Sequence, residues 1–90
     1  MTPFEDAIVA VLRSLRRGEL VTYGEVAEDA GYPGRARAVG RVLGKVADVP
    51  WWRVVAADGR LVPGHEEIQA ALLRDEGIVV RSGRAILPKP

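Results

Sequence analysis

The chain has 90 residues, a formal net charge of +1 and no cysteine, and His65 is its only histidine. These facts exclude disulfides, thiolate metal sites and a cysteine nucleophile, argue against a zinc centre, and lead us to expect neither metal nor cofactor. The length suits a single domain over residues 1–90, and the lack of a long apolar run or a basic leader predicts a cytoplasmic protein with no membrane partner.

The first predicted element is a helix that begins with the sequence TPFE at residues 2–5. This is a capping box, in which the threonine and glutamate side chains satisfy each other's backbone N–H groups, and proline is favoured at the first helical position. Apolar residues then recur at helical spacing, and Gly18 is a helix terminator. The sequence therefore predicts a helix from Pro3 to Arg17.

Two shorter helices are predicted next, separated by a turn at residues 32–34. A second capping box, TYGE at residues 22–25, opens a helix expected to end near Gly31. The third helix is predicted over residues 35–46, with an apolar face formed by Val39, Val42, Leu43 and Val46. Two short helices joined by a tight turn that contains glycine are typical of a helix-turn-helix, and the third helix takes the recognition position.

The pattern changes from helical to extended after Pro50. Residues 52–55 predict a strand, residues 57–59 a turn and residues 60–62 a returning strand, and together these would form the wing of a winged helix. The predicted fold class is therefore α/β and mostly α, a winged helix-turn-helix DNA-binding domain with a small β wing.

The chain is expected to end in a helix and a hairpin. Residues 65–76 predict the last helix, and Gly77 stands where a left-handed cap is favoured. Two short apolar runs, at residues 78–80 and 85–87, flank Ser82-Gly83 and predict a terminal hairpin.

The third predicted helix carries two stripes of residues spaced four apart, which places each stripe on one face. The small stripe consists of Ala36, Gly40 and Gly44, and the basic stripe beside it consists of Arg37, Arg41 and Lys45. Glycine inside a helix costs about 1 kcal/mol relative to alanine, so the small stripe needs a reason. Close approach of a nucleic acid and close packing against another helix are both consistent with the spacing.

These stripes lie in the most basic third of the chain, because residues 31–60 have six arginines and lysines against two aspartates. Such an excess fits a phosphate footprint, although a solvated surface is the commoner cause. The same third holds both tryptophans of the chain, at positions 51 and 52. Alternate residues of a strand face inward, so core packing accounts for one tryptophan and not for both.

Four motifs occur in the order and approximate spacing of one known family. They are VTYGEVA at residues 21–27, RAVG at 37–40, PWWRVV at 50–55 and LLRDEG at 72–77. With them the chain resembles the DNA-binding domain of O6-alkylguanine-DNA alkyltransferases, whose active-site pattern is Pro-Cys-His-Arg-Val. Within that family it looks like the alkyltransferase-like proteins, which have Pro-Trp-His-Arg. The resemblance implies a helix in the minor groove, whose width of only about 6 Å would explain the small stripe.

The resemblance also implies that the chain is not an enzyme. Trp51 occupies the position of the reactive cysteine, and an indole cannot accept an alkyl group by displacement. What remains is a pocket that would hold a flipped O6-alkylguanine by stacking and apolar contact, and Val54 is assigned to it. Trp52 is also assigned to the pocket, as its second wall or as a core residue beside it, and it stands where the family has a histidine that relays a proton toward a glutamate. Glu76 matches that glutamate and is expected to have lost both of its partners.

Further roles follow from the same resemblance. Arg37 matches the finger that fills the gap left by the flipped base, and Tyr23 matches the tyrosine that crowds the target phosphate and helps to rotate the nucleotide outward. The remaining expected DNA contacts are Thr22, Arg35, Ala36, Gly40, Arg41, Lys45 and Arg53. The implied partners are double-stranded DNA containing O6-alkylguanine and the nucleotide excision repair proteins that would recognise the resulting complex. The chain is expected to be a monomer.

Three departures from the family's pattern affect the expected pocket. Trp52 replaces the histidine, no asparagine is evident after the third helix, and the nearby loops are shorter. Taken singly, each named site residue also has an ordinary reading as a core or surface side chain. Two other functions therefore stay open: a winged-helix DNA-binding protein that flips no base, and a protein-interaction module that has lost DNA binding.

Overall fold

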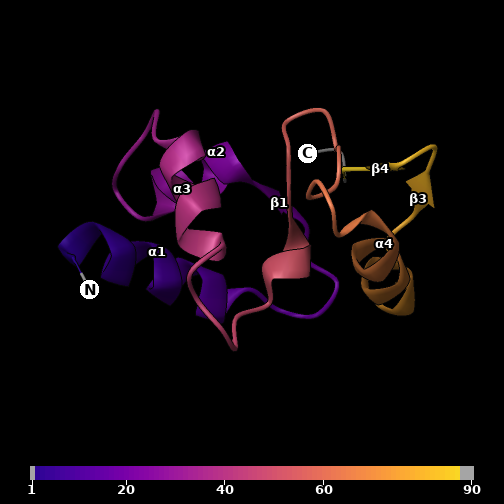
Figure 1. Cartoon of the computed structure of the whole chain (residues 1–90), viewed down its shortest axis with the longest axis horizontal. Coiled ribbons are helices and arrows are strands. Elements are labelled where there is room, and N and C mark those ends of the chain that lie inside the picture. Colours follow the sequence, from indigo (N-terminus) through magenta and orange to yellow (C-terminus); the bar gives the residue numbers. More distant parts are fainter. Residues whose placement is uncertain (1, 88–90) are drawn as a thin grey trace. The chain divides into compact units, whose positions relative to one another are not determined.

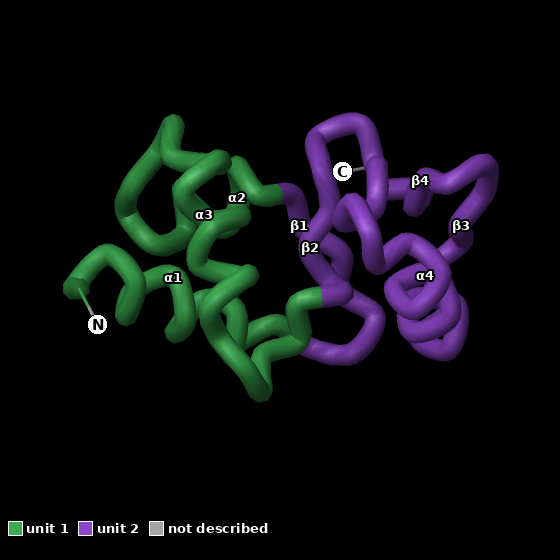
Figure 2. The backbone as a smooth tube through the Cα atoms, viewed as in Figure 1, with its two compact units in different colours: residues 1–15, 23–51 green, residues 16–22, 52–90 purple. Residues whose placement is uncertain are grey.

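The computed structural model describes residues 2–87 (Figure 1), and the chain divides into two compact units (Figure 2). Unit 1 contains the residues up to 15 and residues 23–51, and unit 2 contains residues 16–22 and the residues from 52 onward. Among residues 2–87, no helix is long and apolar enough to cross a membrane.

Unit 1 is built from three helices that pack on one another: α1 (Pro3–Ser14), α2 (Tyr23–Asp29) and α3 (Ala36–Leu43). The capping box of α1 is confirmed, because Thr2 N donates to Glu5 Oε1 at 2.9 Å and Glu5 N donates to Thr2 Oγ1 at 3.1 Å. The helix ends at Ser14 rather than Arg17. Leu15 has an extended backbone, with ψ of 132°, and its side chain is buried, so the chain leaves the helix there.

The helix-turn-helix is confirmed in α2 and α3. The first of these helices ends in a left-handed cap, because Gly31 has φ of +90° and Tyr32 N donates to Ala27 O at 2.8 Å. The second begins at Ala36 and ends at Leu43, earlier than the predicted Val46. Its buried face is formed by Ala38, Val39 and Val42, whereas Leu43 and Val46 are only half-buried.

Unit 2 combines short strands with one helix. Strand β1 (Val21–Thr22) pairs in parallel with β2 (Val54–Val55), and β3 (Val80–Arg81) pairs antiparallel with β4 (Arg84–Ala85). Helix α4 (Glu66–Asp75) matches the prediction closely, and Gly77 takes the expected left-handed conformation, with φ of +83°. The core of this unit is formed by Leu20, Val55, Leu61, Leu73, Val80 and Ala85.

The predicted wing is only partly present. Its turn exists, since Gly59 N donates to Ala56 O at 2.8 Å, and a Cβ on Gly59 would collide with the Ala85 carbonyl, so glycine is required there. The flanking segments differ from the prediction. Residues 51–53 form a 3-10 helix, β2 pairs with β1, and Arg60 bridges to Arg84. Both residues of β2 are fully buried, as in a strand covered on two faces.

The predicted terminal hairpin is confirmed. Its turn residues Ser82 and Gly83 have φ of +51° and +75°, the pattern of a two-residue hairpin turn whose twist matches the flanking strands. Ile86 N donates to Val79 O at 2.9 Å and extends the pairing beyond the two strands.

Candidate nucleic-acid interface

The basic stripe of α3 lies on its exposed side. Arg37 and Arg41 are exposed, and neither has an ion-pair partner among residues 2–87. Lys45, just beyond the helix, places Nζ 3.4 Å from Glu5 Oε2, and its side chain is 69% exposed. An ion pair that exposed stabilises by at most about 1 kcal/mol, so a phosphate can compete for Lys45. Two uncompensated cations and one weakly paired cation therefore lie together in this part of the chain.

Arg35 has a packing role at the start of α3. Its guanidinium carbon lies 4.8 Å from the centre of the Phe4 ring, a cation–π contact. The Phe4 ring in turn meets Tyr32 edge to face, with ring centres 4.8 Å apart. These contacts fasten the turn before α3 to α1, so Arg35 stabilises the recognition helix in addition to its predicted contact with DNA.

Four of the predicted site residues meet in one hollow of unit 1. Tyr23, Ala36, Arg37 and Gly40 line a hollow of about 240 Å³ beside α3. Tyr23 is half-buried, and burial raises the pKa of its hydroxyl, so the side chain stays neutral at physiological pH. The hollow is open because Gly40 has no side chain. A Cβ at that position would lie 3.9 Å from Tyr23 Cε1, and anything longer would enter the space beside the ring.

Internal packing does not explain the small stripe. A Cβ built on Gly40 would meet only Tyr23 Cε1, and one built on Gly44 would meet backbone oxygens no closer than 3.6 Å, so alanine would fit both positions. Neither glycine has a positive φ, and both are exposed. Close packing against another described helix is therefore disfavoured, and close approach by an outside molecule is the explanation that the geometry leaves.

The two tryptophans stand on the short 3-10 helix η1 (Trp51–Arg53). Trp51 N donates to Val49 O at 2.8 Å, which starts the turn. Successive residues of a 3-10 helix are rotated by roughly 120°, so adjacent indoles point in different directions. Trp52 packs against the core of unit 2, whereas Trp51 is a half-buried residue of unit 1. Core packing therefore accounts for Trp52.

Glu76 lies at the centre of a buried polar network in unit 2. Its side chain is 4% exposed, and its two carboxylate oxygens accept hydrogen bonds from three residues. Trp52 Nε1 and Gly18 N each donate at 2.8 Å, and Arg53 donates from Nε at 3.0 Å and Nη2 at 2.8 Å. The Arg53 bond, aided by the Gly18 and Trp52 N–H groups, lowers the pKa of Glu76 to about 2. The cysteine and histidine that partner this glutamate in the family are absent here, and an indole N–H and a guanidinium bind Glu76 in their place.

This network changes the assignment of two predicted site residues. Arg53 is 13% exposed and is bound to Glu76 through two nitrogens, while its guanidinium carbon lies 5.2 Å from the centre of the Trp52 ring. It is thus occupied within the protein rather than placed to contact a phosphate. Val54 is fully buried, so its side chain belongs to the core rather than to an open pocket. Thr22 is half-buried at the end of β1, immediately before α2.

Sequence reasoning missed one residue of this region, Gln69. It is the only side-chain amide in the chain, and it lies fully buried on α4. Its Nε2 donates to the carbonyls of Trp52 and Val54, each at 3.0 Å, and its Oε1 accepts from Val62 N at 2.7 Å. One signal could have revealed it. Gln69 lies four residues before the apolar Leu73, and this spacing places its amide on the buried face of the helix.

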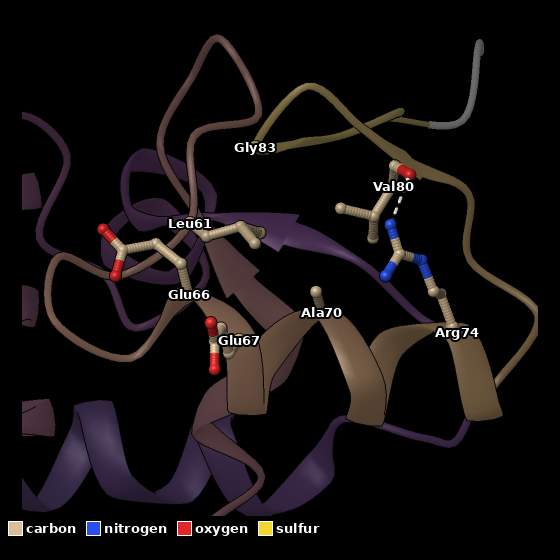
Figure 3. Close-up of a pocket in the computed structure, with 7 residues that line it drawn as sticks. All are labelled: Leu61, Glu66, Glu67, Ala70, Arg74, Val80 and Gly83. Atoms are coloured by element: carbon tan, nitrogen blue, oxygen red, sulfur yellow. Dashed lines mark hydrogen bonds between the residues drawn. The ribbon is translucent and has the colours of Figure 1, made fainter.

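A second hollow, of about 370 Å³, lies in unit 2 (Figure 3). It is lined by Leu61, Glu66, Glu67, Ala70, Arg74, Val80 and Gly83. Arg74 donates from Nη2 to Val80 O at 3.0 Å, and Glu66 and Glu67 have no ion-pair partner within residues 2–87. Two uncompensated carboxylates repel phosphate, so this hollow is not part of the nucleic-acid interface.

Comparison with known proteins agrees with this geometry. Residues 3–78 match the family model of the DNA-binding domain of 6-O-methylguanine DNA methyltransferase. A DNA base-flipping protein of Vibrio parahaemolyticus is 40% identical over 85 residues, which cover 89% of this chain and 85% of that protein. A methylated-DNA–protein-cysteine methyltransferase of Shigella flexneri is 36% identical over 88% of this chain, which spans only 49% of that enzyme. The structure of S. pombe Atl1 in complex with damaged DNA containing O6-carboxymethylguanine matches with a TM-score of 0.85 and 28% identity, over 98% of this chain and 91% of that chain.

Proposed function

We propose that this chain, which belongs to the family of the DNA-binding domain of 6-O-methylguanine DNA methyltransferase, is a sensor. It would bind alkylated guanine in DNA without repairing it. The observation that carries the proposal is Trp51, an indole that follows Pro50 where the enzymes of the family have their cysteine, in a chain that has no cysteine. The relatives named for base flipping and for damaged DNA support it.

The chemistry of alkyl transfer explains why binding is left without turnover. In the transfer reaction a thiolate attacks the alkyl carbon, a new S–C bond forms, and the bond from that carbon to O6 of guanine breaks. The lone pair of an indole nitrogen belongs to the aromatic system and is a poor nucleophile. Trp51 therefore offers an apolar aromatic surface that can stack against a base or contact its alkyl group, with no step that removes the group.

The α3 surface is the proposed contact with the minor groove. Its small stripe permits close approach, and the exposed charges of Arg41 and Lys45 would bind phosphates on either side of the groove. Lys45 would exchange Glu5 for a phosphate on binding, a small cost for an exposed pair. Each phosphate contact releases counterions, so affinity should fall as the salt concentration rises.

Tyr23 and Arg37 are the proposed flipping residues, because they line one hollow and are held on adjacent helices. The neutral ring of Tyr23 would crowd the target nucleotide, and Arg37 would fill the space that the base leaves in the stack. Extrusion of a base costs a few kcal/mol and least for a damaged one, so the lesion itself contributes to selectivity. Trp51 would then face the extruded base, with Trp52 holding the turn in place through Glu76.

We propose further that the chain acts as one monomeric alkyltransferase-like domain, and that its lesion complex is recognised by nucleotide excision repair proteins. The family match over residues 3–78 includes segments of both units, which supports a single functional domain. The proposed recruitment of repair proteins rests on the resemblance to the alkyltransferase-like proteins.

The proposal is tested by titrating the protein with two duplexes that differ only in one guanine, unmodified or carrying an O6-methyl group. We expect tighter binding to the modified duplex and weaker binding to both at higher salt. Equal binding would instead support a DNA-binding protein that flips no base, and no binding would support a protein-interaction module. Arg13, an exposed arginine on α1, offers a matched control through Arg13→Ala, which should leave both affinities unchanged.

A further inference from the structure

The amide of Gln69 joins three segments of unit 2 from a fully buried position. Its two donated hydrogen bonds go to the carbonyls of Trp52 and Val54, which lie on either side of Arg53, and the one that it accepts comes from the loop at Val62. A 3-10 turn of three residues has few backbone hydrogen bonds of its own. The conformation of the chain around Arg53 is therefore fixed from outside, by α4.

This set of contacts uses every polar group of a side-chain amide. A side-chain amide supplies two N–H donors and one carbonyl acceptor, and all three groups are used here. Glutamate would lack the donors, lysine would lack the acceptor, and an apolar side chain would leave all three backbone groups without their partner. Leaving a buried backbone group unsatisfied is costly, so replacement of the amide must shift the turn, the loop or both.

We propose that Gln69 is a positioning residue of the lesion site. Its amide holds the backbone of the Trp51–Arg53 turn in the binding conformation before DNA arrives. The inference rests on the proposed function, and it extends that function to a residue on α4 that none of the family motifs contains. A turn that is already ordered loses no conformational freedom when the base enters, so the benefit appears in lesion binding. Helix α3 belongs to unit 1, so its proposed contacts with undamaged DNA would not involve this amide.

The test replaces Gln69 by a side chain of similar length that makes no hydrogen bond, Gln69→Met. Leu73→Val is the matched control, because Leu73 is also fully buried on α4 and its side chain has no polar contact. For each variant, dissociation constants are measured with the modified and unmodified duplexes, and acrylamide quenching of tryptophan fluorescence is measured in the free protein. We expect Gln69→Met to lower the preference for the modified duplex, measured as the Kd for the unmodified duplex divided by the Kd for the modified one, by about tenfold. We also expect acrylamide to quench the tryptophan fluorescence of this variant more strongly than that of the wild type. Leu73→Val should keep both values within about twofold of the wild type.

Two results would overturn the inference: an unchanged ratio in folded Gln69→Met, or an equal loss in Leu73→Val. A measurement on the wild type covers the case in which Gln69→Met does not fold. The Gln69 side-chain NH₂ group gives the only such signal in a ¹H–¹⁵N spectrum of this chain, and we expect its protons to exchange slowly with water. Fast exchange would show that the amide is not held and would refute its role.

Failure of the proposed function gives a different pattern. If the wild type has no preference for the modified duplex, the sensor function is wrong, and the role of Gln69 at a lesion site falls with it. The quenching and proton-exchange results would still decide whether Gln69 holds the turn.

Discussion

The buried pair of Arg53 and Glu76 should make the stability of the protein depend on pH in a defined range. The pKa of Glu76 is lowered from 4.5 to about 2 by the Arg53 hydrogen bond and by the Gly18 and Trp52 N–H groups. Because the pKa is lower in the folded than in the unfolded state, the stabilisation is complete above pH 4.5 and is lost as the pH falls toward about 2. At 1.36 kcal/mol for each pKa unit, the contribution of this group is about 3 kcal/mol.

Removing one partner should be more damaging than removing both. Glu76→Gln leaves the nearly buried Arg53 without a counter-charge, and we expect it to lower the free energy of unfolding at pH 7 by roughly 3–5 kcal/mol. The double variant Arg53→Met with Glu76→Gln has no buried charge and should recover part of that loss. It should also lose the pH dependence, so its deficit relative to the wild type should shrink by about 2.5 kcal/mol between pH 6 and pH 2.5.

The assay is urea unfolding followed by far-ultraviolet circular dichroism at a series of pH values. Glu5 and Asp58 also have lowered pKa values, chiefly through backbone hydrogen bonds, but they are present in both proteins and cancel in the difference. A control removes the exposed pair of Arg17 and Asp75, whose side chains are 65% and 73% exposed, and should cost less than about 1 kcal/mol. Parallel pH profiles for the wild type and the double variant would refute the role given to Glu76.

Four further changes test the DNA face and the tryptophan turn. Arg37→Ala should weaken binding to O6-methylguanine duplex several-fold more than binding to undamaged duplex in paired titrations; equal losses would make Arg37 a phosphate contact. Tyr23→Phe should retain most of the lesion affinity that Tyr23→Ala loses, since the ring provides the crowding; similar losses would point to the hydroxyl. Gly40→Ala should stabilise the fold by about 0.5–1 kcal/mol in urea unfolding yet weaken DNA binding, and unchanged binding would remove the small stripe from the interface. Trp51→Cys should transfer no label from duplex carrying radiolabelled O6-methylguanine at a measurable rate. A lone thiol has a pKa of about 8.5 and is mostly protonated at pH 7, and Trp52 cannot deprotonate it as the family's histidine does. Fast transfer by this variant would contradict that reasoning.

Local signals predicted most of the helical structure. The capping box at residues 2–5 set the start of α1, and Gly31 and Gly77 marked helix ends because both adopt the left-handed conformation that glycine favours. The end of α1 was not predictable from periodicity, because Leu15 continues the apolar spacing while its backbone is already extended. The side chain of Leu15 is buried although the residue lies outside the helix, so its apolar character does not indicate where the helix ends.

Pairing between distant segments could not be derived in the same way. A short apolar run predicts a strand but not its partner, and β2 pairs with β1 rather than with the following segment. The ion pair of Arg53 was not predicted for a related reason. A basic residue in a basic region suggests phosphate binding. Only the fold shows that Arg53 forms an ion pair with Glu76. The single glutamine of the chain was visible in the sequence, but its three backbone partners were not.

Base flipping is the central claim, and fluorescence of 2-aminopurine tests it most directly. The analogue is placed next to an O6-methylguanine in a duplex, where stacking quenches its emission, and the protein is added to saturation with excitation beyond the tryptophan band. We expect a large rise in emission as the neighbouring base leaves the stack, no comparable rise with unmodified guanine, and a smaller rise with Arg37→Ala. Saturated binding to the O6-methylguanine duplex without a change in emission would show that the protein recognises its DNA with the base still stacked, and would contradict the proposed mechanism.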